Sequence, residues 1–427
     1  MIHAQPRRSS RRIAIAVRGL AMAGVVAAGA CRHAAVANTV KQVAAPALSE
    51  AEIRDRDIEF YRSRSAADPS GAADLARLAS LYLQRSRETG DQRDAARAED
   101  AARRSLHNRR SHNDQAAQVL TSSLLAQHRF DEALAVARDL RNQNPGSPSL
   151  SAAVAEIEME VGQYDSARVA FDSLSSARDD LSVVPRLARW AEIEGRPDEA
   201  RRLMRHALAL AQHAAWLPRE QVAWFWMRSG DIEFRAGRYG AADSAYARGL
   251  AIHPEDYRVL AALSRLAAAQ RRWTRAIEYG SRAIASNLDP ATLGTLSDAY
   301  AALGDTARAS EIARALDVSV RLQPGAYHRA WSLFLLDHGR QLRTVHAKIV
   351  AELRSRHDVY AYDLYAWSLH KQGRDAGALR AIRRALAQGT QDAQLLYHAS
   401  VIEQAAGRTA DASEHLARAR TLNPGLQ

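Results

Sequence analysis

Residues 223–256 read AWFWMRSGDIEFRAGRYGAADSAYARGLAIHPED, and this stretch decides the fold. Two runs of helical composition flank Gly237, and Pro254 follows the second run. A glycine just past a helix supplies a left-handed backbone conformation, and a proline cannot continue the helix before it. The stretch therefore predicts two helices joined by a tight turn, with a new start after Pro254.

The same glycine break recurs along most of the chain at a regular spacing. It is marked by Gly162, Gly195, Gly237, Gly304, Gly339, Gly373 and Gly407. These glycines are 33, 42, 67, 35, 34 and 34 residues apart, and the 67-residue step spans two units with Arg271 in the glycine's place. A period near 34, without the alternation typical of β-strands, indicates stacked helix pairs.

At these positions the chain resembles the tetratricopeptide repeat family over nearly all of residues 71–427. The resemblance is carried in residues 223–256 by Trp226, Gly230, Gly237, Tyr239, Ala242, Tyr246 and Pro254. Residues 393–426 supply Leu396, Gly407, Ala412, Leu416, Ala419 and Pro424, and residues 114–147 supply Leu120, Leu124, Phe130, Ala133, Leu140 and Pro145. This resemblance implies an all-α fold, a right-handed superhelical solenoid of about ten helix-turn-helix units.

Small residues recur in the second helix of each unit. They are Ala133, Ala167, Ala200, Ala242, Ala276, Ala309, Ala378 and Ala412, whereas the unit that starts at residue 325 has Thr344 at this position. Small side chains let paired helices approach closely, and large residues fill the space between pairs. One pair cannot bury its apolar face alone, so we expect stability to come from stacking.

The repeat divides the chain into five predicted segments. They are a signal peptide (1–30), a flexible tether (31–47), a leading helix (48–70), and two repeat blocks (71–222 and 223–427). The 42-residue step between Gly195 and Gly237 holds about eight extra residues, which predict a longer second helix and a corner at Trp216-Leu217-Pro218. This insertion separates the two blocks.

The leading helix has a recognisable start. Ser49 can cap it while Glu52 reaches back across the first turn. We expect Ile53, Phe60 and Tyr61 to contact the core.

The N-terminal segment has the features of an export signal. Five arginines within residues 1–18 precede an apolar stretch that ends in Ala28-Gly29-Ala30-Cys31. This end resembles a bacterial lipoprotein signal, which implies that Cys31, the chain's one cysteine, is lipidated. Lipoproteins that are retained in the inner membrane have an aspartate directly after the lipidated cysteine, whereas this chain has Arg32 there. The resemblance therefore implies an outer-membrane protein that faces the periplasm. A simply cleaved signal and a periplasmic protein remain the alternative.

The charge of the chain is concentrated at that end. The chain has 59 basic and 48 acidic residues, but residues 1–30 contain five arginines and no acid, so the rest carries 54 against 48, or +6. The hydrophobic content of 47% and charged content of 25% are typical of a globular protein. A single cysteine excludes an internal disulfide framework.

The sequence offers no motif for catalysis, cofactors or metals. It lacks phosphate-binding glycine loops, a nucleophile elbow and a zincin motif. His206 and His213 share a helix face without a third metal ligand. Asp363, Ser368 and His370 lie within two turns of one helix, but Ser368 points away from the other two, so no nucleophile meets a base. We therefore predict a protein that is not an enzyme, with no cofactor and no metal.

The family resemblance implies a concave binding groove lined by the first helix of each unit. The family's offsets select Trp224, Arg228, Asp231, Phe234, Arg235, Arg258, Arg265, Tyr360, Asp363, Trp367, His370 and Lys371. Exposed aromatic and arginine side chains commonly anchor an extended peptide or helix. Alternatively, Trp224 and Trp367 fill gaps between adjacent units.

These observations favour a non-catalytic scaffold of the cell envelope that binds segments of a partner protein in this groove. One alternative is an assembly or recruitment factor for cell-wall or polysaccharide enzymes. Another is a regulatory nucleic-acid-associated protein, suggested by the pI of about 10.1. We expect a protein or peptide partner, a membrane contact through the N-terminal lipid, and no nucleic acid.

Overall fold

The computed structural model describes residues 48–321 and 329–426, which form 21 α-helices and no strand. The predicted signal, tether and Cys31 lie outside these residues. The helices are α1 (Glu50–Ala67), α2 (Ala72–Thr89), α3 (Gln92–Asn108), α4 (Asp114–Ala126), α5 (Phe130–Gln143), α6 (Pro148–Glu160), α7 (Tyr164–Ser173), α8 (Val184–Ile193), α9 (Pro197–His213), α10 (Arg219–Arg235), α11 (Tyr239–Ile252), α12 (Tyr257–Ala269), α13 (Trp273–Ser286), α14 (Pro290–Ala302), α15 (Thr306–Arg321), α16 (Arg329–Asp337), α17 (Leu342–Glu352), α18 (Val359–His370), α19 (Asp375–Leu386), α20 (Ala393–Ala405) and α21 (Thr409–Leu422).

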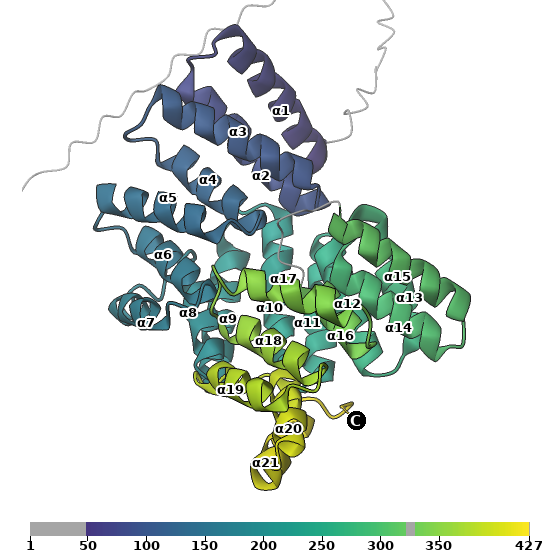
Figure 1. Cartoon of the computed structure of the whole chain (residues 1–427). Helices are drawn as coiled ribbons and strands as arrows, with labels where there is room; N and C mark the ends of the chain where they lie inside the picture. Colours follow the sequence, from purple (N-terminus) through teal and green to yellow (C-terminus); the bar gives the residue numbers. More distant parts are fainter. Residues whose placement is uncertain (1–47, 322–328, 427) are drawn as a thin grey trace, which may run out of the picture. The chain divides into compact units, whose positions relative to one another are not determined.

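After α1, the helices form ten pairs, from α2 with α3 to α20 with α21. Each first helix packs against its second helix, and each pair follows the previous one along the array (Figure 1). We call the even-numbered members the first helices and the odd-numbered members the second helices. The predicted all-α solenoid of about ten units is confirmed.

The turn within each pair depends on a left-handed residue. The seven predicted glycines all have φ between +65° and +84°, and Arg271 takes the same conformation at φ +57°. The eight predicted alanines of the second helices are buried. In α17, however, Thr344 is exposed and its neighbour Val345 is the buried residue, because this helix starts one residue out of step with the other units.

The leading helix α1 starts as predicted and packs differently. Ser49 and Glu52 form the capping box. The expected core contacts of Ile53 and Phe60 are wrong, since these side chains are 48% and 55% exposed. The face at Ile58, which is buried, and the half-buried Tyr61 packs on α2 instead.

The predicted insertion lengthens two helices. Both α9 and α10 have 17 residues, against 14 in α5 and α11. The chain turns the expected corner between them, with Trp216 74% exposed. The block boundary predicted at residue 223 falls inside α10, which begins at Arg219.

Turns early in the array contact linkers much later in the sequence. The His357 amide donates to the Val161 carbonyl over 3.0 Å, and the Val359 amide donates to the Tyr164 hydroxyl over 2.7 Å. The Thr390 hydroxyl donates to the Ile193 carbonyl across 197 positions, and Tyr239 bonds Asn423 across 184. We call this set of contacts the seam. The seam holds the three helix pairs from α6 to α11 against the three helix pairs from α16 to α21.

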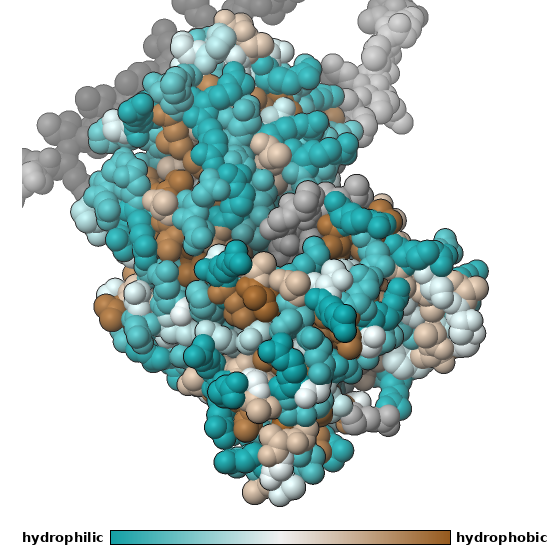
Figure 2. Space-filling model, viewed as in Figure 1, coloured by the Kyte–Doolittle hydropathy of each residue, from teal (hydrophilic) through white to brown (hydrophobic). Residues whose placement is uncertain are grey.

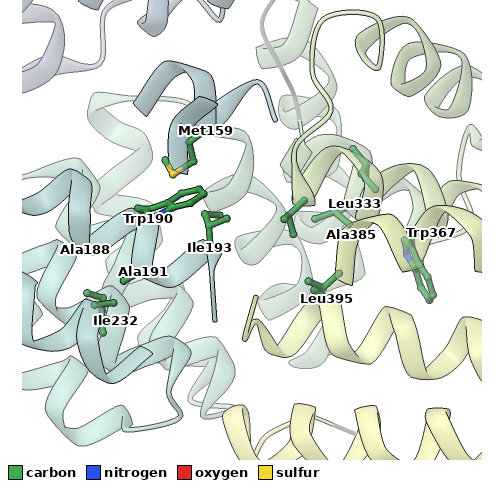
Figure 3. Close-up of a cluster of buried hydrophobic side chains, with 14 of the residues drawn as sticks. Met159, Ala188, Trp190, Ala191, Ile193, Ile232, Leu333, Trp367, Ala385 and Leu395 are labelled. Carbon is green, nitrogen blue, oxygen red and sulfur yellow. The ribbon is translucent and has the colours of Figure 1, made fainter. Parts of the chain in front are cut away.

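The largest apolar core accompanies the seam. Phe171 stacks on Trp190 with 5.3 Å between ring centroids. Figure 3 shows Met159 and Ile193 beside the Trp190 indole, and Leu333, Ala385 and Leu395 belong to the same buried cluster. The visible face in Figure 2 is mostly hydrophilic, with apolar residues in a narrow band over its upper part and in separate patches elsewhere. Within the described ranges, no helix combines the length and hydropathy needed to cross a bilayer.

Because of the seam, we expect the turn at Gly195 to tolerate an alanine substitution less well than the turn at Gly407. A methyl group added at Gly195, where φ is +69°, would overlap the Gly389 carbonyl oxygen, whereas Gly407 at φ +75° has open space around it. We expect Gly407→Ala to lower the free energy of unfolding by about 1 kcal/mol, the cost of a left-handed alanine. Gly195→Ala should lose roughly 3 kcal/mol, because the seam must also open. Urea unfolding of both variants measures the difference, and equal losses would contradict the seam.

Candidate binding passage along the first helices

Three cavities adjoin one another along the first helices. One of about 240 Å³ lies by α4, α6 and α8, a second of about 610 Å³ between α8 and α10, and a third of about 510 Å³ beside the seam. The first and second share Glu156 and Arg186, and the second and third share Glu160, Arg189 and Arg235. Because neighbouring cavities share walls, we treat them as one inner passage.

The structure places most of the predicted groove residues around this passage. Trp224, Arg228, Arg235 and Arg258 line the second cavity. Phe234, Arg235, Arg265 and Tyr360 line the third. Asp231 lies buried behind them and accepts hydrogen bonds from Arg228 and Arg265.

The four remaining candidates from α18 and its C-terminal end lie outside these walls. Asp363 and Trp367 are 0% and 5% exposed, so neither is available as an exposed anchor. Asp363 accepts from His398 over 2.7 Å, and Trp367 stacks on the same histidine ring at 4.2 Å. For Trp367, the gap-filling alternative matches its position. His370 pairs with Asp375, and the Lys371 ammonium lies over the Trp367 ring.

Sequence reasoning missed the contribution of α8. Arg186 and Arg189 line the passage, and Glu192 joins three of its arginines. The signal was present, since the family offsets counted back from Gly195 instead of Gly237 select these same three residues. Residues brought in across the seam, such as Arg356 beside the Phe130 ring, had no local signal.

An ion-pair network connects α8, α10 and α12. Glu192 accepts from Arg228 over 3.1 Å and from Arg235, and it lies 3.7 Å from Arg189. Asp231 continues the network, with Arg228 at 3.0 Å and Arg265 at 2.7 Å. Because each carboxylate is shared between guanidinium groups, the inward side chains of three helices are held in a common geometry.

The pKa values reflect this sharing. Burial alone would raise the pKa of Glu192, but Arg235, Arg228 and Arg189 outweigh it and lower the pKa to about 2. Burial likewise opposes Arg265 and Arg228 at Asp231, whose pKa is also lowered to about 2. Glu160 differs, because burial outweighs its contact with Arg189 and raises its pKa. The network therefore holds two firmly ionised carboxylates and a third that takes up a proton more readily.

Aromatic side chains alternate with these charges. Trp224 meets Phe225 edge-on, with 5.0 Å between ring centroids. Tyr360 has the guanidinium groups of Arg189 at 5.5 Å and Arg329 at 5.0 Å from its ring centre. Arg265 lies 5.0 Å above Phe234. Cation–π contacts of this kind add to the order of the passage wall.

The described side chains offer binding surfaces more readily than reaction chemistry. The Ser368 hydroxyl, 2.9 Å from His346, is fully buried and donates to the Tyr365 carbonyl, and the far nitrogen of His346 faces Arg374 rather than a carboxylate. That environment does not activate a nucleophile. Among residues 48–321 and 329–426, no three His, Cys, Asp or Glu side chains converge as metal ligands.

The network predicts an acid-dependent stability. A lowered pKa in the folded state stabilises the fold above the ordinary carboxylate pKa of about 4, and this stabilisation disappears as the pH falls toward 2. We expect Glu192→Gln to lower the free energy of unfolding at pH 7 by about 3 kcal/mol, because three partly buried guanidinium groups lose their shared partner. Its stability should also change less between pH 5 and pH 2 than that of the wild type. Urea unfolding over this pH range measures both effects.

The matched control is Glu278→Gln, which makes the same charge change on the exposed face of α13. It should leave the pH profile unchanged. If the two variants behaved alike, Glu192 would not hold the passage wall together.

Comparison with known proteins finds similarity to tetratricopeptide repeats. The tetratricopeptide repeat family model matches residues 124–188, which span α5 to α7 with the neighbouring parts of α4 and α8. No curated protein sequence matches the chain at a significant level. Similar solved structures include PilW, a type IV pilus biogenesis factor, with 19% identity, a TM-score of 0.42, and coverage of 53% of this chain and 99% of PilW.

Two further structures are similar at comparable levels. The human IFIT1 dimer with PPP-AAAA has 14% identity and a TM-score of 0.46, covering 86% of this chain and 87% of IFIT1. Pseudomonas aeruginosa PilF has 16% identity and a TM-score of 0.39, covering 52% of this chain and 97% of PilF. The family model thus identifies residues 124–188 as a tetratricopeptide repeat segment, and the ten helix pairs repeat the same helix-turn-helix arrangement along residues 72–321 and 329–422.

Proposed function

We propose that this protein is a non-catalytic interaction scaffold that holds an extended segment of a partner protein in the inner passage. The observation that carries the proposal is the row of three adjoining cavities along the first helices, in which each cavity shares lining residues with the next. A row of adjoining cavities suits a chain-like ligand better than a compact one, because successive residues of the ligand can occupy successive cavities.

The walls offer contacts suited to a polypeptide. Ser122 and Ser149 line the first cavity, and their hydroxyl groups can bond backbone amides and carbonyls. Trp224 and Arg235 in the second cavity are partly accessible, and Arg265 in the third is 50% exposed. Partly exposed tryptophan and arginine side chains in a concave site are typical anchors of protein interfaces.

The ion pairs favour a protein over a nucleic acid. Arg87 bonds Glu220 at 3.1 Å, Arg186 bonds Glu156 at 2.7 Å, and Arg258 bonds Asp256 at 3.0 Å. A phosphate backbone would have to displace these carboxylates, and their negative charge opposes its approach. A polypeptide can instead bond to the edges of the pairs without separating them.

Site-specific photo-crosslinking in cells tests the passage. A photoreactive residue at Gln221, which lines the second cavity, should give discrete protein adducts, whereas one at the exposed Glu414 on α21 should not. Trp224→Ala should reduce the Gln221 adducts by about tenfold, because it removes the largest aromatic group of that cavity. Mass spectrometry of the adducts names the partner.

A loss of adducts counts only if the Trp224→Ala variant keeps its thermal unfolding transition. Identical adducts at Gln221 and Glu414 would contradict binding in the passage. Recurrent cell-wall or polysaccharide enzymes among the adducts would favour the recruitment role that the sequence also suggests.

We further propose that the scaffold is exported and anchored in the outer membrane through a lipid on Cys31, with the repeat array in the periplasm. The basic residues, apolar run and small residues before Cys31 support this location. Cys31→Ser should move the protein from the membrane fraction to the soluble fraction and abolish incorporation of labelled palmitate, since the thioether cannot form. If the Cys31→Ser variant were found in the membrane fraction in the same proportion as the wild type, the lipid anchor would be contradicted. The passage proposal would not be affected.

A further inference from the structure

A cavity separate from the inner passage opens on the other side of α10. It has a volume of about 250 Å³ and lies between α9, α10 and α11. Trp224, in the inner passage, and Trp226, in this cavity, are two positions apart and so about 200° apart around the helix. We call the cavity between α9, α10 and α11 the outer notch. Its lining residues are Arg201, Met204, Arg205 and Leu208 of α9, Trp226, Ser229, Ile232 and Glu233 of α10, and Ala241, Ser244, Ala245 and Arg248 of α11.

Each helix presents one regular face to the notch. The residues of α9 and of α11 both follow the spacing i, i+3, i+4, i+7, which places each set on a single side of its helix. On α11 this side carries Ala241, Ser244 and Ala245, whose small side chains leave the space open. The notch is therefore built by the register of the helices.

The bottom of the notch is apolar. Met204, Leu208 and Ile232 are buried around it, and the Trp226 indole forms one wall. The inserted residues lengthen α9 and α10 on either side of the corner that joins them. An apolar group the size of a leucine or phenylalanine side chain can fill this floor and remove it from water.

The rim is cationic, and two of its arginines have no carboxylate partner. Arg201 is held by Asp198 and Glu233. Arg205 and Arg248, by contrast, have no carboxylate of the described residues within ion-pair distance, and Arg248 instead lies 4.9 Å over the Trp226 ring. Most arginines of this protein that line a cavity have an acidic partner, so two without one beside an apolar floor indicate an anionic ligand.

A hydroxyl in the wall also lacks a partner. The Ser229 oxygen is buried and makes no hydrogen bond to any described residue. A buried polar atom without a partner costs free energy, and a ligand that reaches it recovers this cost. Floor, rim and hydroxyl thus call for an apolar group, a negative charge and a hydrogen-bonding group close together.

We propose that the outer notch binds a carboxylate attached directly to an apolar group, with the apolar group on the floor and the carboxylate between Arg205 and Arg248. This chemistry occurs in a free apolar amino-acid derivative and at the end of a polypeptide whose last residue is apolar. A binding site here would be independent of the inner passage, because it uses the opposite side of α10.

Isothermal titration of the purified protein with N-acetyl-leucine and N-acetyl-leucinamide tests the charge requirement. The acid should bind at least tenfold more tightly than the amide, because only the acid forms charge-assisted hydrogen bonds with the rim. A hexapeptide that ends in leucine, with and without C-terminal amidation, separates the two sources. Equal affinity of hexapeptide and N-acetyl-leucine would identify a single residue as the ligand, and tighter binding of the hexapeptide would identify a chain end.

Matched arginine variants test the location. Arg205→Gln and Arg248→Gln should each weaken binding of the acid about tenfold. Arg202→Gln makes the same charge change on an exposed position of α9 that does not line the notch, and it should leave binding unchanged. Filling the notch by Ala241→Phe should abolish binding while the thermal transition stays in place, since Ala241 is exposed.

Three results would overturn the proposal. They are equal affinity for acid and amide, an Arg202→Gln effect as large as that of the rim variants, and no binding of any probe at millimolar concentration. None of these results bears on the photo-crosslinking at Gln221, so the notch and the passage fail or succeed separately.

Discussion

The close approach of within-pair turns to linkers about 195 positions later is the constraint on which the rest of the structure depends. At Gly162 and Gly195 the backbone is left-handed. It lies so close to the opposing linker backbone, at His357 and Gly389 respectively, that no side chain fits. Backbone amides, the Tyr164 hydroxyl and the Thr390 hydroxyl then complete the contact. A solenoid gains most of its stability from nearest neighbours. This one adds contacts between distant units, and they carry its largest apolar core.

The seam also determines what the passage can be. It brings Phe130, Arg356, Tyr239 and Asn423 to one cavity beside Arg189 and Arg235. The passage wall therefore combines neighbouring first helices with residues from across the seam. The ion pairs around Glu192 and Asp231 hold this wall in one arrangement, which lowers the conformational entropy that the wall side chains would otherwise lose when a ligand binds.

Helix α10 lines a cavity on each of two opposite sides. One side presents Trp224, Arg228 and Arg235 to the passage, and the other presents Trp226 and Ser229 to the outer notch. Gly249 lets α11 lie close against α10, since a side chain there would meet the Ala223 carbonyl. The insertion that lengthens α9 and α10 thus coincides with the region where both cavities are found.

The sequence by itself determined the helix pairs, their number and their turns, because a 34-residue spacing of glycine, small and aromatic residues is a local property that each unit repeats. It also selected Trp224, Arg228 and Arg235, since the offset of a residue fixes its side of a helix. Only the tertiary structure decided that Asp363 and Trp367 are buried and that Arg356 reaches Phe130. Those outcomes depend on contacts between units far apart in the chain, where the curvature accumulated over several pairs brings side chains together that no local spacing relates.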